Sequence, residues 1–320
     1  MKKVAILTSG GDAPGMNACI RAAVRYGIYR GYKTYGVERG YRGLIEDDIF
    51  QMYPRSVSDI VQKGGTILHT ARCPEFKDYD VRMQAAENLR KRDIDNLIVI
   101  GGDGSLHGAL DLFNDFGINV AGLPGTIDND LAYTDFTIGF DTAVNTVLWA
   151  INHLRDTNTA HERVSIVEVM GRNCGDIALY AGLAGGCEYV LVPEIKVDFR
   201  EVAESVQQST KRGKTSNMIV FAEGAGDKTE LIKAIKEITG RTPTVTTLGH
   251  IQRGGGPNMS DRILAARMSV HAVDVLSSGE GAWAVGIKDG KIIDMDLAKA
   301  LSMKKEVDSE LYKLTRALSI

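Results

Sequence analysis

The chain contains 320 residues, of which 44% are hydrophobic and 25% charged, and its formal net charge is −3 at pH 7. This length and composition are typical of a globular protein with two domains, each burying its own core. Because there is no basic tail or stripe, nucleic acid is not expected as a partner, and no apolar run approaches the roughly 18 residues that a membrane span needs. Four widely spaced cysteines, and a strand pattern soon after Met1, predict a cytoplasmic protein with reduced thiols and no signal peptide.

Short β-branched runs alternate with longer helical patterns, as in doubly wound α/β folds. In chain order, the expected strands are residues 4–7, 33–37, 97–100, 120–123, 164–169, 189–192, 218–221 and 245–248, followed by a hairpin of residues 283–287 and 291–293. Helices are expected to begin near Met16 and Cys174 and to cover residues 105–113, 141–155 and 258–276. No repeat or linker interrupts this alternation, so composition alone marks no domain boundary.

Two loops that follow apolar strands are the most informative features. Residues 101–105, the second glycine loop, read Gly-Gly-Asp-Gly-Ser, and residues 124–130, the acidic loop, read Pro-Gly-Thr-Ile-Asp-Asn-Asp. Bare backbone amides beside Asp103 suit a phosphate and its Mg²⁺ ion, although Asp103 or Ser105 can also simply cap a helix. The acidic loop offers a hydroxyl and two carboxylates, one of which can accept a proton from a substrate hydroxyl, unless both are only solvated. At such strand ends this combination favours phosphoryl transfer.

Other loops contain glycine and arginine. Residues 10–15, the first glycine loop, precede a helix and can bind an anion or form only a tight turn. Arg172 and Arg253 follow two further strands beside glycines and suit a sugar phosphate, although a single arginine more often forms a surface salt bridge. Arg163 precedes the strand at 164–169, whereas Arg172 follows it, so the two arginines lie at opposite ends of this strand. Arg163 can therefore reach the same ligand only if it comes from another subunit or takes an unusual route.

Six basic residues outside these loops, here called the basic set, have the spacing expected of charged residues on solvent-exposed helix faces. They are Arg21, Arg25, Arg155, Lys211, Arg212 and Lys214. The histidines show no metal-ligand spacing, so zinc is not expected.

These motifs together resemble those of the bacterial 6-phosphofructokinases, in the same order and over nearly the whole chain. The matching segments are residues 8–17, 101–105, 124–130, 168–172 and 248–255. The resemblance implies an α/β fold with two three-layer (αβα) Rossmann-like domains, mostly parallel sheets, and interleaving in sequence. The implied domains are residues 1–138 with 251–301 for ATP, and residues 139–250 with 302–320 for fructose 6-phosphate.

The resemblance also implies the reaction, in which ATP and fructose 6-phosphate give ADP and fructose 1,6-bisphosphate, a committed step of glycolysis. Asp128 matches the catalytic base that acts on the 1-hydroxyl, and Thr126 and Asp130 match its partners. Gly11 and Arg72 match groups that stabilise the transferring phosphoryl group. The implied nucleotide site, with Asp103 as the Mg²⁺ ligand, comprises Gly11, Tyr41, Arg72, Cys73, Gly102, Asp103, Gly104, Ser105 and Gly108. The implied sugar-phosphate site comprises Thr126, Asp128, Asp130, Arg163, Met170, Gly171, Arg172, Glu223, His250 and Arg253.

In the family, Arg163 reaches the sugar phosphate from a neighbouring subunit of a homotetramer, which removes the difficulty of its strand end. The basic set, in turn, matches an effector site between subunits that binds ADP or phosphoenolpyruvate. The implied effector site comprises Arg21, Arg25, Asp59, Arg155, Gly186, Glu188, Lys211, Arg212 and Lys214. The resemblance therefore implies shared active and effector sites.

Two glycines bear on the phosphate donor. The pyrophosphate-using branch of the family carries an aspartate where this chain has Gly104 and a lysine where it has Gly125. An aspartate at 104 would crowd and repel an α-phosphate, so the resemblance favours ATP.

This chain departs from the family at several positions. Thr244 replaces an arginine that contacts the sugar 6-phosphate across the subunit boundary, a loss of about 1.5–3 kcal/mol unless Arg241 substitutes. Cys73 replaces an aromatic residue near the adenine, Lys77 replaces an arginine, and Arg55 is one position away from an effector-region arginine. Two other functions stay open: a weakly active regulatory homologue, or another kinase with this glycine loop that acts on NAD or a lipid.

Overall fold

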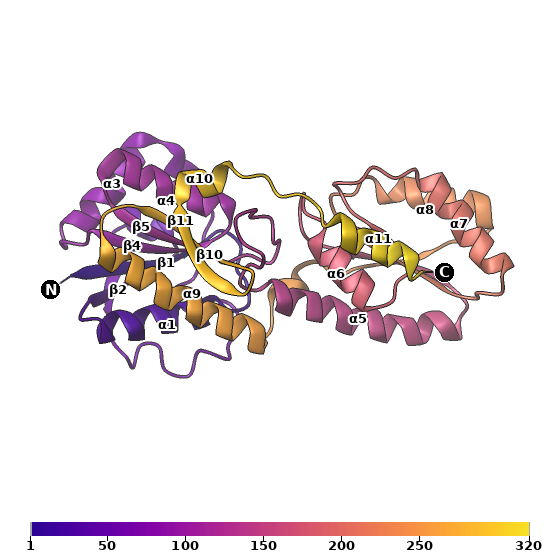
Figure 1. Cartoon of the computed structure of the whole chain (residues 1–320), viewed down its shortest axis with the longest axis horizontal. Helices are drawn as coiled ribbons and strands as arrows, with labels where there is room; N and C mark the ends of the chain where they lie inside the picture. The colour runs from indigo at the N-terminus through magenta and orange to yellow at the C-terminus, as the bar shows by residue number, and fades with distance from the viewer. Residues whose placement is uncertain (1, 320) are drawn as a thin grey trace. The chain divides into compact units, whose positions relative to one another are not determined.

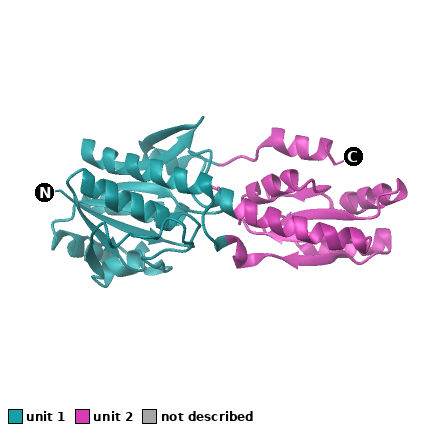
Figure 2. Ribbon diagram, turned by 90° about the horizontal axis from the view of Figure 1, so that it is seen from below, with its two compact units in different colours: residues 1–127, 131–142, 253–304 teal, residues 128–130, 143–252, 305–320 magenta. Residues whose placement is uncertain are grey.

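The computed structural model describes residues 2–319 and forms two compact units (Figure 2). Within these residues, the first unit comprises 2–127, 131–142 and 253–304, and the second comprises 128–130, 143–252 and 305–319. Each unit has its own mostly parallel sheet, so the predicted α/β class is confirmed. The assignment of ATP to one unit and of the sugar phosphate to the other stays a prediction.

The first unit contains a seven-stranded sheet in the order β11-β10-β5-β4-β1-β2-β3. The strands are β1 (Lys3–Ser9), β2 (Lys33–Val37), β3 (Ile49–Met52), β4 (Asn96–Gly101), β5 (Asn119–Pro124), β10 (Ala282–Lys288) and β11 (Lys291–Asp296). Neighbouring strands are parallel except at the edges, where β3 and β11 pair antiparallel with β2 and β10. The strand order reverses between β1 and β4, the kind of position at which open α/β sheets bind ligands.

Helices cover both faces of this sheet (Figure 1). One face carries α1 (Met16–Tyr29) and α9 (Met259–Ser278), and the other carries α2 (Tyr41–Ile45), η1 (Pro74–Lys77), α3 (Tyr79–Arg90), α4 (Asp103–Phe116) and α10 (Leu297–Ser302). The central strands are buried almost throughout because helices cover both sides. Ala5 and Leu7 join the core beneath α2, α3 and α4, whereas Val4 faces α1, so alternate residues of β1 serve two helical layers.

The second unit contains four parallel strands in the order β7-β8-β6-β9. They are β6 (Val164–Val169), β7 (Tyr189–Leu191), β8 (Asn217–Ala222) and β9 (Thr244–Thr247). On one face, α7 (Phe199–Lys211) and α8 (Lys228–Thr239) pack together over Ile166, Ile219 and Phe221. The unit also contains α6 (Asp176–Ala184), η2 (Gly249–Arg253) up to Gln252, most of α5 (Phe140–Ala160), and α11 (Ser309–Ala317), which packs on α6 (Figure 1).

All of the strands predicted from the sequence are present, with ends that differ by a few residues. The predicted hairpin turns at Asp289 and Gly290, whose φ angles of 49° and 74° are those that a tight hairpin turn requires. The sequence did not predict β3, the helix α3, the short α2, α10 and α11, or the 3₁₀ helices η1 and η2. Among the described residues, no helix is both long enough and apolar enough to cross a membrane.

Candidate active site

Three loops lie side by side at the carboxyl end of the first sheet. In the parallel register, Ser9 of β1 lies opposite Gly101 of β4, and Gly101 lies opposite Pro124 of β5. Both glycine loops and the start of the acidic loop follow directly from these residues. These three segments, of the five that the sequence singled out, therefore lie together at the edge where the strand order reverses.

In the first glycine loop, the space beside Gly11 is occupied by the side chain of Arg253. A Cβ atom there would lie 2.5 Å from Nη1 of Arg253, and the same guanidinium donates to the carbonyl of Asp12 at 3.1 Å. Arg253 thus lies against this loop in the first unit. The loop ends at Gly15, where φ is 107°, and no side chain caps α1. Amides of the first turn of α1 are consequently oriented as in an anion site.

Arg72 lies on a segment that is tied to the first glycine loop. The Thr70 hydroxyl donates to the Gly10 carbonyl at 2.8 Å, and the Thr8 hydroxyl donates to the His69 carbonyl at 2.8 Å. These bonds keep the chain just before Arg72 at the carboxyl end of β1, and Arg72 itself is exposed. Its guanidinium is therefore accessible to an anion.

Several predicted nucleotide residues gather around Tyr41. Its buried hydroxyl donates to the carbonyl of Ser105, and its ring stacks on Phe76 with centroids 4.0 Å apart. A Cβ at Gly108 would lie 3.1 Å from this ring, so glycine lets α4 pack closely on Tyr41. Burial raises the pKa of the Tyr41 hydroxyl well above its usual value, which keeps it a donor. Cys73 packs on the edge of the same core.

Gly104 and Gly125 differ in what the fold requires of them. A Cβ at Gly104 meets no atom within 4 Å, so packing within this chain does not demand glycine there. A Cβ at Gly125 would lie 2.7 Å from Cγ2 of Ile100, so packing at the strand end explains this glycine without reference to any ligand. The packing of the chain therefore accounts for glycine at 125 but not at 104, where the open space suits a ligand.

Asp103 is the first residue of α4 and is exposed, and the N-cap of this helix, Gly102, has no side chain. In the described part of the chain, no three His, Cys, Asp or Glu side chains are grouped to hold a metal ion. A single protein carboxylate is enough to bind Mg²⁺ when phosphates of the substrate and water molecules supply the remaining ligands of its octahedral coordination. The open space beside Gly104 leaves room for such phosphates, so the donor set fits a nucleotide-bound Mg²⁺ rather than a resident metal.

The acidic loop places Asp128 in a buried position, where the residue is 2% exposed. Its Oδ2 atom lies 3.3 Å from Nε of Arg172, whose own side chain is 59% exposed. Thr126 is also buried, and its carbonyl accepts from the Thr137 hydroxyl at 2.7 Å. A buried carboxylate paired with one accessible guanidinium is suited to proton transfer on a bound substrate.

Five of the predicted sugar-phosphate residues of the second unit lie at the carboxyl ends of three adjacent strands. Met170, Gly171 and Arg172 follow β6, Glu223 follows β8, and His250 follows β9. The Arg172 amide donates to Oε1 of Glu223 at 2.9 Å, which connects the first two strand ends.

The sequence did not point to Gln252, which connects the third strand end. It is fully buried, accepts from the Met170 amide at 3.2 Å and donates to the Gly249 carbonyl at 2.9 Å. A single glutamine between Ile251 and Arg253 gives no periodic signal in the sequence.

Arg163 lies at the amino end of β6, as the sequence indicated, and so is at the opposite end of the strand from Met170. Thr244 begins β9 at this same edge, and its hydroxyl lies 2.8 Å from that of Ser165. Arg241 is also at this edge, where its Nη1 donates to the carbonyls of Glu162 and Thr215 at 3.2 Å each. In this arrangement the Arg241 guanidinium is used for backbone contacts.

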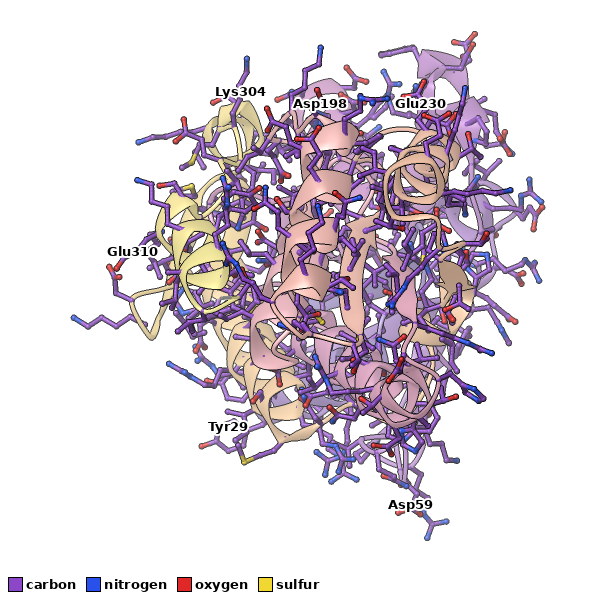
Figure 3. All side chains as sticks on the ribbon, turned by 90° about the vertical axis from the view of Figure 1, so that its right-hand side faces the viewer. Tyr29, Asp59, Asp198, Glu230, Lys304 and Glu310 are labelled. Carbon is purple, nitrogen blue, oxygen red and sulfur yellow. The ribbon has the colours of Figure 1, made fainter. Side chains whose placement is uncertain are left out.

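The predicted effector residues divide between the two units. In the second unit, Arg155 donates to the carbonyls of Gly185 and Gly186, and Lys214 pairs with the buried Glu188 at 3.0 Å. Lys211 and Arg212 end α7 in the same unit. The first unit contains Arg21, Arg25 and Asp59, of which Asp59 is exposed on a left-handed backbone (Figure 3).

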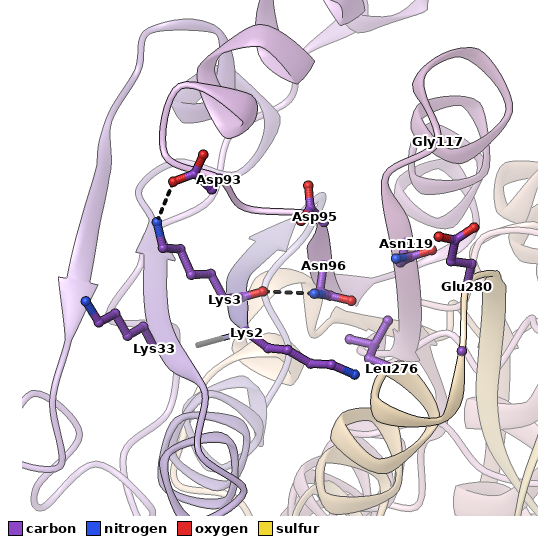
Figure 4. Close-up of a pocket in the computed structure, with 11 residues that line it drawn as sticks. Lys2, Lys3, Lys33, Asp93, Asp95, Asn96, Gly117, Asn119, Leu276 and Glu280 are labelled. Carbon is purple, nitrogen blue, oxygen red and sulfur yellow. Dashed lines mark hydrogen bonds and ion pairs between the residues drawn. The ribbon is translucent and has the colours of Figure 1, made fainter.

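A cavity of about 840 Å³ opens at the amino end of the first sheet, away from these loops (Figure 4). Lys2, Lys3 and Lys33 line it together with Asp93 and Glu280. Asp95 also lines the cavity, so three carboxylates balance three lysines, and Lys3 pairs with Asp93 at 3.0 Å. The charges of the lining therefore favour neither sign of ligand.

The chain belongs to the phosphofructokinase family, because the family model described as "Phosphofructokinase" matches residues 3–276. Curated relatives specify the class further. The ATP-dependent 6-phosphofructokinase of Clostridium botulinum strain Hall is 58% identical over 319 residues, and that of Clostridium acetobutylicum is 57% identical, with 100% of each chain covered in both cases. The predicted family is thus confirmed, and the chain groups with the ATP-dependent 6-phosphofructokinases, kinases of glycolysis.

Solved structures agree with this assignment. The structure of phosphofructokinase from Saccharomyces cerevisiae matches with a TM-score of 0.89 at 35% identity and covers 100% of this chain, which spans 48% of the yeast chain. A pyrophosphate-dependent phosphofructokinase from Marinobacter aquaeolei matches with a TM-score of 0.86 at 22% identity, covering 99% and 91% of the two chains. The second likeness concerns the fold alone.

Proposed function

We propose that the chain transfers the γ-phosphoryl group of ATP to the 1-hydroxyl of fructose 6-phosphate, with Asp128 as the base. The observation that carries this proposal is the buried Asp128 carboxylate, paired with Arg172 next to a strand edge that also holds Glu223 and His250. The carboxylate accepts the hydroxyl proton as the O–P bond forms and the bond to ADP breaks. Thr126 and Asp130 lie in the same loop and orient the reacting groups.

On the nucleotide side, the two glycine loops hold the phosphates through backbone amides at the switch point of the first sheet. Asp103 would hold Mg²⁺, which supplies neutralisation of phosphate charge when bound. The exposed Arg72 supplies the cationic contact that a lysine provides in other phosphate-binding loops. Tyr41 and Gly108 shape the wall behind Ser105.

The direct test measures fructose 1,6-bisphosphate formation from fructose 6-phosphate, with ATP and with pyrophosphate. We expect product with ATP, and loss of most turnover in Asp128→Ser with the thermal unfolding transition retained. Near-normal turnover in that variant would refute the role of Asp128. No product with either donor would support the weakly active regulatory homologue or the kinase of another substrate.

We also propose a homotetramer in which Arg163 completes the sugar-phosphate site of a neighbouring subunit. The supporting observation is that Arg163 and the residues it should join lie at opposite ends of one strand, β6. Mixing inactive Arg163→Ala chains with inactive Asp128→Ser chains should restore part of the activity, because some sites then receive both native residues. Sedimentation gives the subunit number, and mixtures that stay inactive in mixed tetramers would contradict the shared site.

We propose that the second-unit group around Glu188 and Arg155 belongs to an effector site between subunits that binds ADP or phosphoenolpyruvate. Its support is a buried carboxylate paired with Lys214 beside carbonyl-bound Arg155. We expect Lys214→Ala to abolish the response of the substrate saturation curve to both effectors. A response like that of the parent chain would exclude this site.

A further inference from the structure

Asn129 separates the two carboxylates of the acidic loop and is held at both ends by the segment that begins α6. Its side-chain Nδ2 donates to Oδ2 of Asp176 at 2.7 Å, and its backbone carbonyl lies 3.7 Å from Sγ of Cys174. Burial raises the pKa of the Cys174 thiol to about 12, so the thiol keeps its proton and can donate. Asn129 itself is 1% exposed.

The backbone at Asn129 also needs this support. Its φ of 53° is left-handed, a conformation that asparagine tolerates better than most residues but that is rarely adopted without local contacts. A change in this one residue would redirect both neighbours, Asp128 and Asp130, because they flank it in sequence. The conformation of the acidic loop therefore depends on what holds the Asn129 amide.

Asp176 is a buried carboxylate, 3% exposed, in the first turn of α6. Besides the Asn129 amide, its Oδ2 atom faces Nζ of Lys305 at 3.3 Å. Lys305 is the first residue of the C-terminal segment in the second unit and lies between α10 and α11. A carboxylate this deeply buried is retained only where a cation and hydrogen bonds compensate its charge. Lys305, Asp176 and Asn129 thus form a linear chain of contacts that ends at the acidic loop.

We propose that Asp176 is a positioning residue for the phosphoryl-transfer reaction, holding the acidic loop through Asn129 and itself held by Lys305 of the C-terminal segment. The proposal rests on the proposed function, in which Asp128 is the base. It makes the C-terminal segment a contributor to turnover even though Lys305 touches no predicted substrate residue.

The test uses Asn129→Gly, because glycine adopts the left-handed backbone freely and the change removes only the amide. We expect kcat to fall about 10- to 100-fold, the loss associated with misplacing a reacting group by about 1 Å, while the KM values for both substrates change little. Lys305→Met should lower kcat in the same direction by a smaller factor. The neighbouring, exposed Lys304 (labelled in Figure 3) provides the control Lys304→Met, which should leave the kinetics unchanged.

The decisive measurement is the double variant Asn129→Gly/Lys305→Met. If Lys305 acts through Asn129, the second substitution adds no further loss of kcat once the amide is gone, whereas independent structural effects multiply. Turnover of Asn129→Gly at the parent rate, or multiplicative losses, would overturn the proposal. Should Asn129→Gly fail to fold, Asp176→Asn takes its place in the same cycle, since it removes the charge that Lys305 pairs with.

Asp128→Ser measured in parallel separates the two proposals. If Asp128→Ser keeps its turnover, the proposed base is wrong, and the positioning role falls with it. If Asp128→Ser is inactive while Asn129→Gly and Lys305→Met are fully active and folded, only the positioning role is refuted.

Discussion

Gly104→Asp separates the needs of the fold from those of the nucleotide. Gly104 is the second residue of α4, and a Cβ there meets no atom within 4 Å. Glycine within a helix costs about 1 kcal/mol relative to alanine, and a carboxylate in the first turn gains about 0.3–1 kcal/mol from the helix dipole. We therefore expect the melting temperature to stay the same or rise by about 2–4 °C.

The same carboxylate should weaken ATP binding. Two like unit charges about 8 Å apart repel by about 2 kcal/mol at an effective dielectric constant of about 20. That repulsion corresponds to roughly 30-fold in affinity. We expect the KM for ATP to rise by this factor while the KM for fructose 6-phosphate is unchanged.

The assay combines thermal unfolding with initial rates at varied ATP, at low and high salt. Gly104→Asn is the matched control, because it fills the same space without the charge, and its difference from Gly104→Asp isolates repulsion. Added salt should reduce that difference. Unchanged ATP affinity in Gly104→Asp, or equal losses in both variants, would refute the electrostatic reasoning, and a lower melting temperature would refute the argument from open space.

Three further substitutions test other parts of the structure. Partial burial raises the pKa of Glu168, but hydrogen bonds from a lysine and a threonine outweigh this effect and hold the pKa below its usual 4.5. Glu168→Gln should therefore be less stable than the parent to urea at neutral pH, and the difference should shrink below pH 4.5 and vanish below the folded-state pKa. A difference in stability that does not depend on pH would contradict this reasoning. Thr244→Arg replaces the contact with Ser165 by a cation at the end of the sheet where Arg163 lies. This substitution should lower the KM for fructose 6-phosphate at least 10-fold. An unchanged KM would mean that the absent arginine has no effect in this protein. Gly125→Ala introduces a 2.7 Å contact with Ile100 of the neighbouring strand β4 and should lower the free energy of unfolding in urea by about 1–3 kcal/mol. Stability equal to that of the parent would show that this strand end accommodates the added methyl group without strain.

The strands were predictable because buried parallel strands give short runs rich in apolar and β-branched residues, as at residues 97–100 and 164–169. The short helices were not, because α2 and α10 have five and six residues and too few turns to show a period. β3 was missed for a related reason: Ile49 and Met52 are buried, but the two residues between them are exposed, so no alternation is visible.

The candidate site likewise has parts that the sequence predicts and parts that it does not. Loops marked by glycine beside a carboxylate, such as 101–105, were found from the sequence because their composition is unusual. Contacts between segments that are distant in sequence could not be found from composition. Nothing in the sequence pairs Asp176 with Lys305, or places Arg253 against Gly11, because these contacts arise from the fold. Likewise, one glycine resembles another in sequence, and only the packing on Ile100 separates Gly125 from Gly104.

The position of β10 in the first sheet has a consequence for how the chain is made. β10 pairs with β5, yet it follows β5 by about 160 residues, an interval that includes all four strands of the second unit. At a synthesis rate of about 5–20 residues per second, the outer edge of β5 stays unpaired on the ribosome for on the order of 10 s. During this time the second unit can complete its own sheet. A nascent chain of this protein therefore carries an exposed edge of β5 after the second unit can already fold, and this edge needs protection from pairing with other chains.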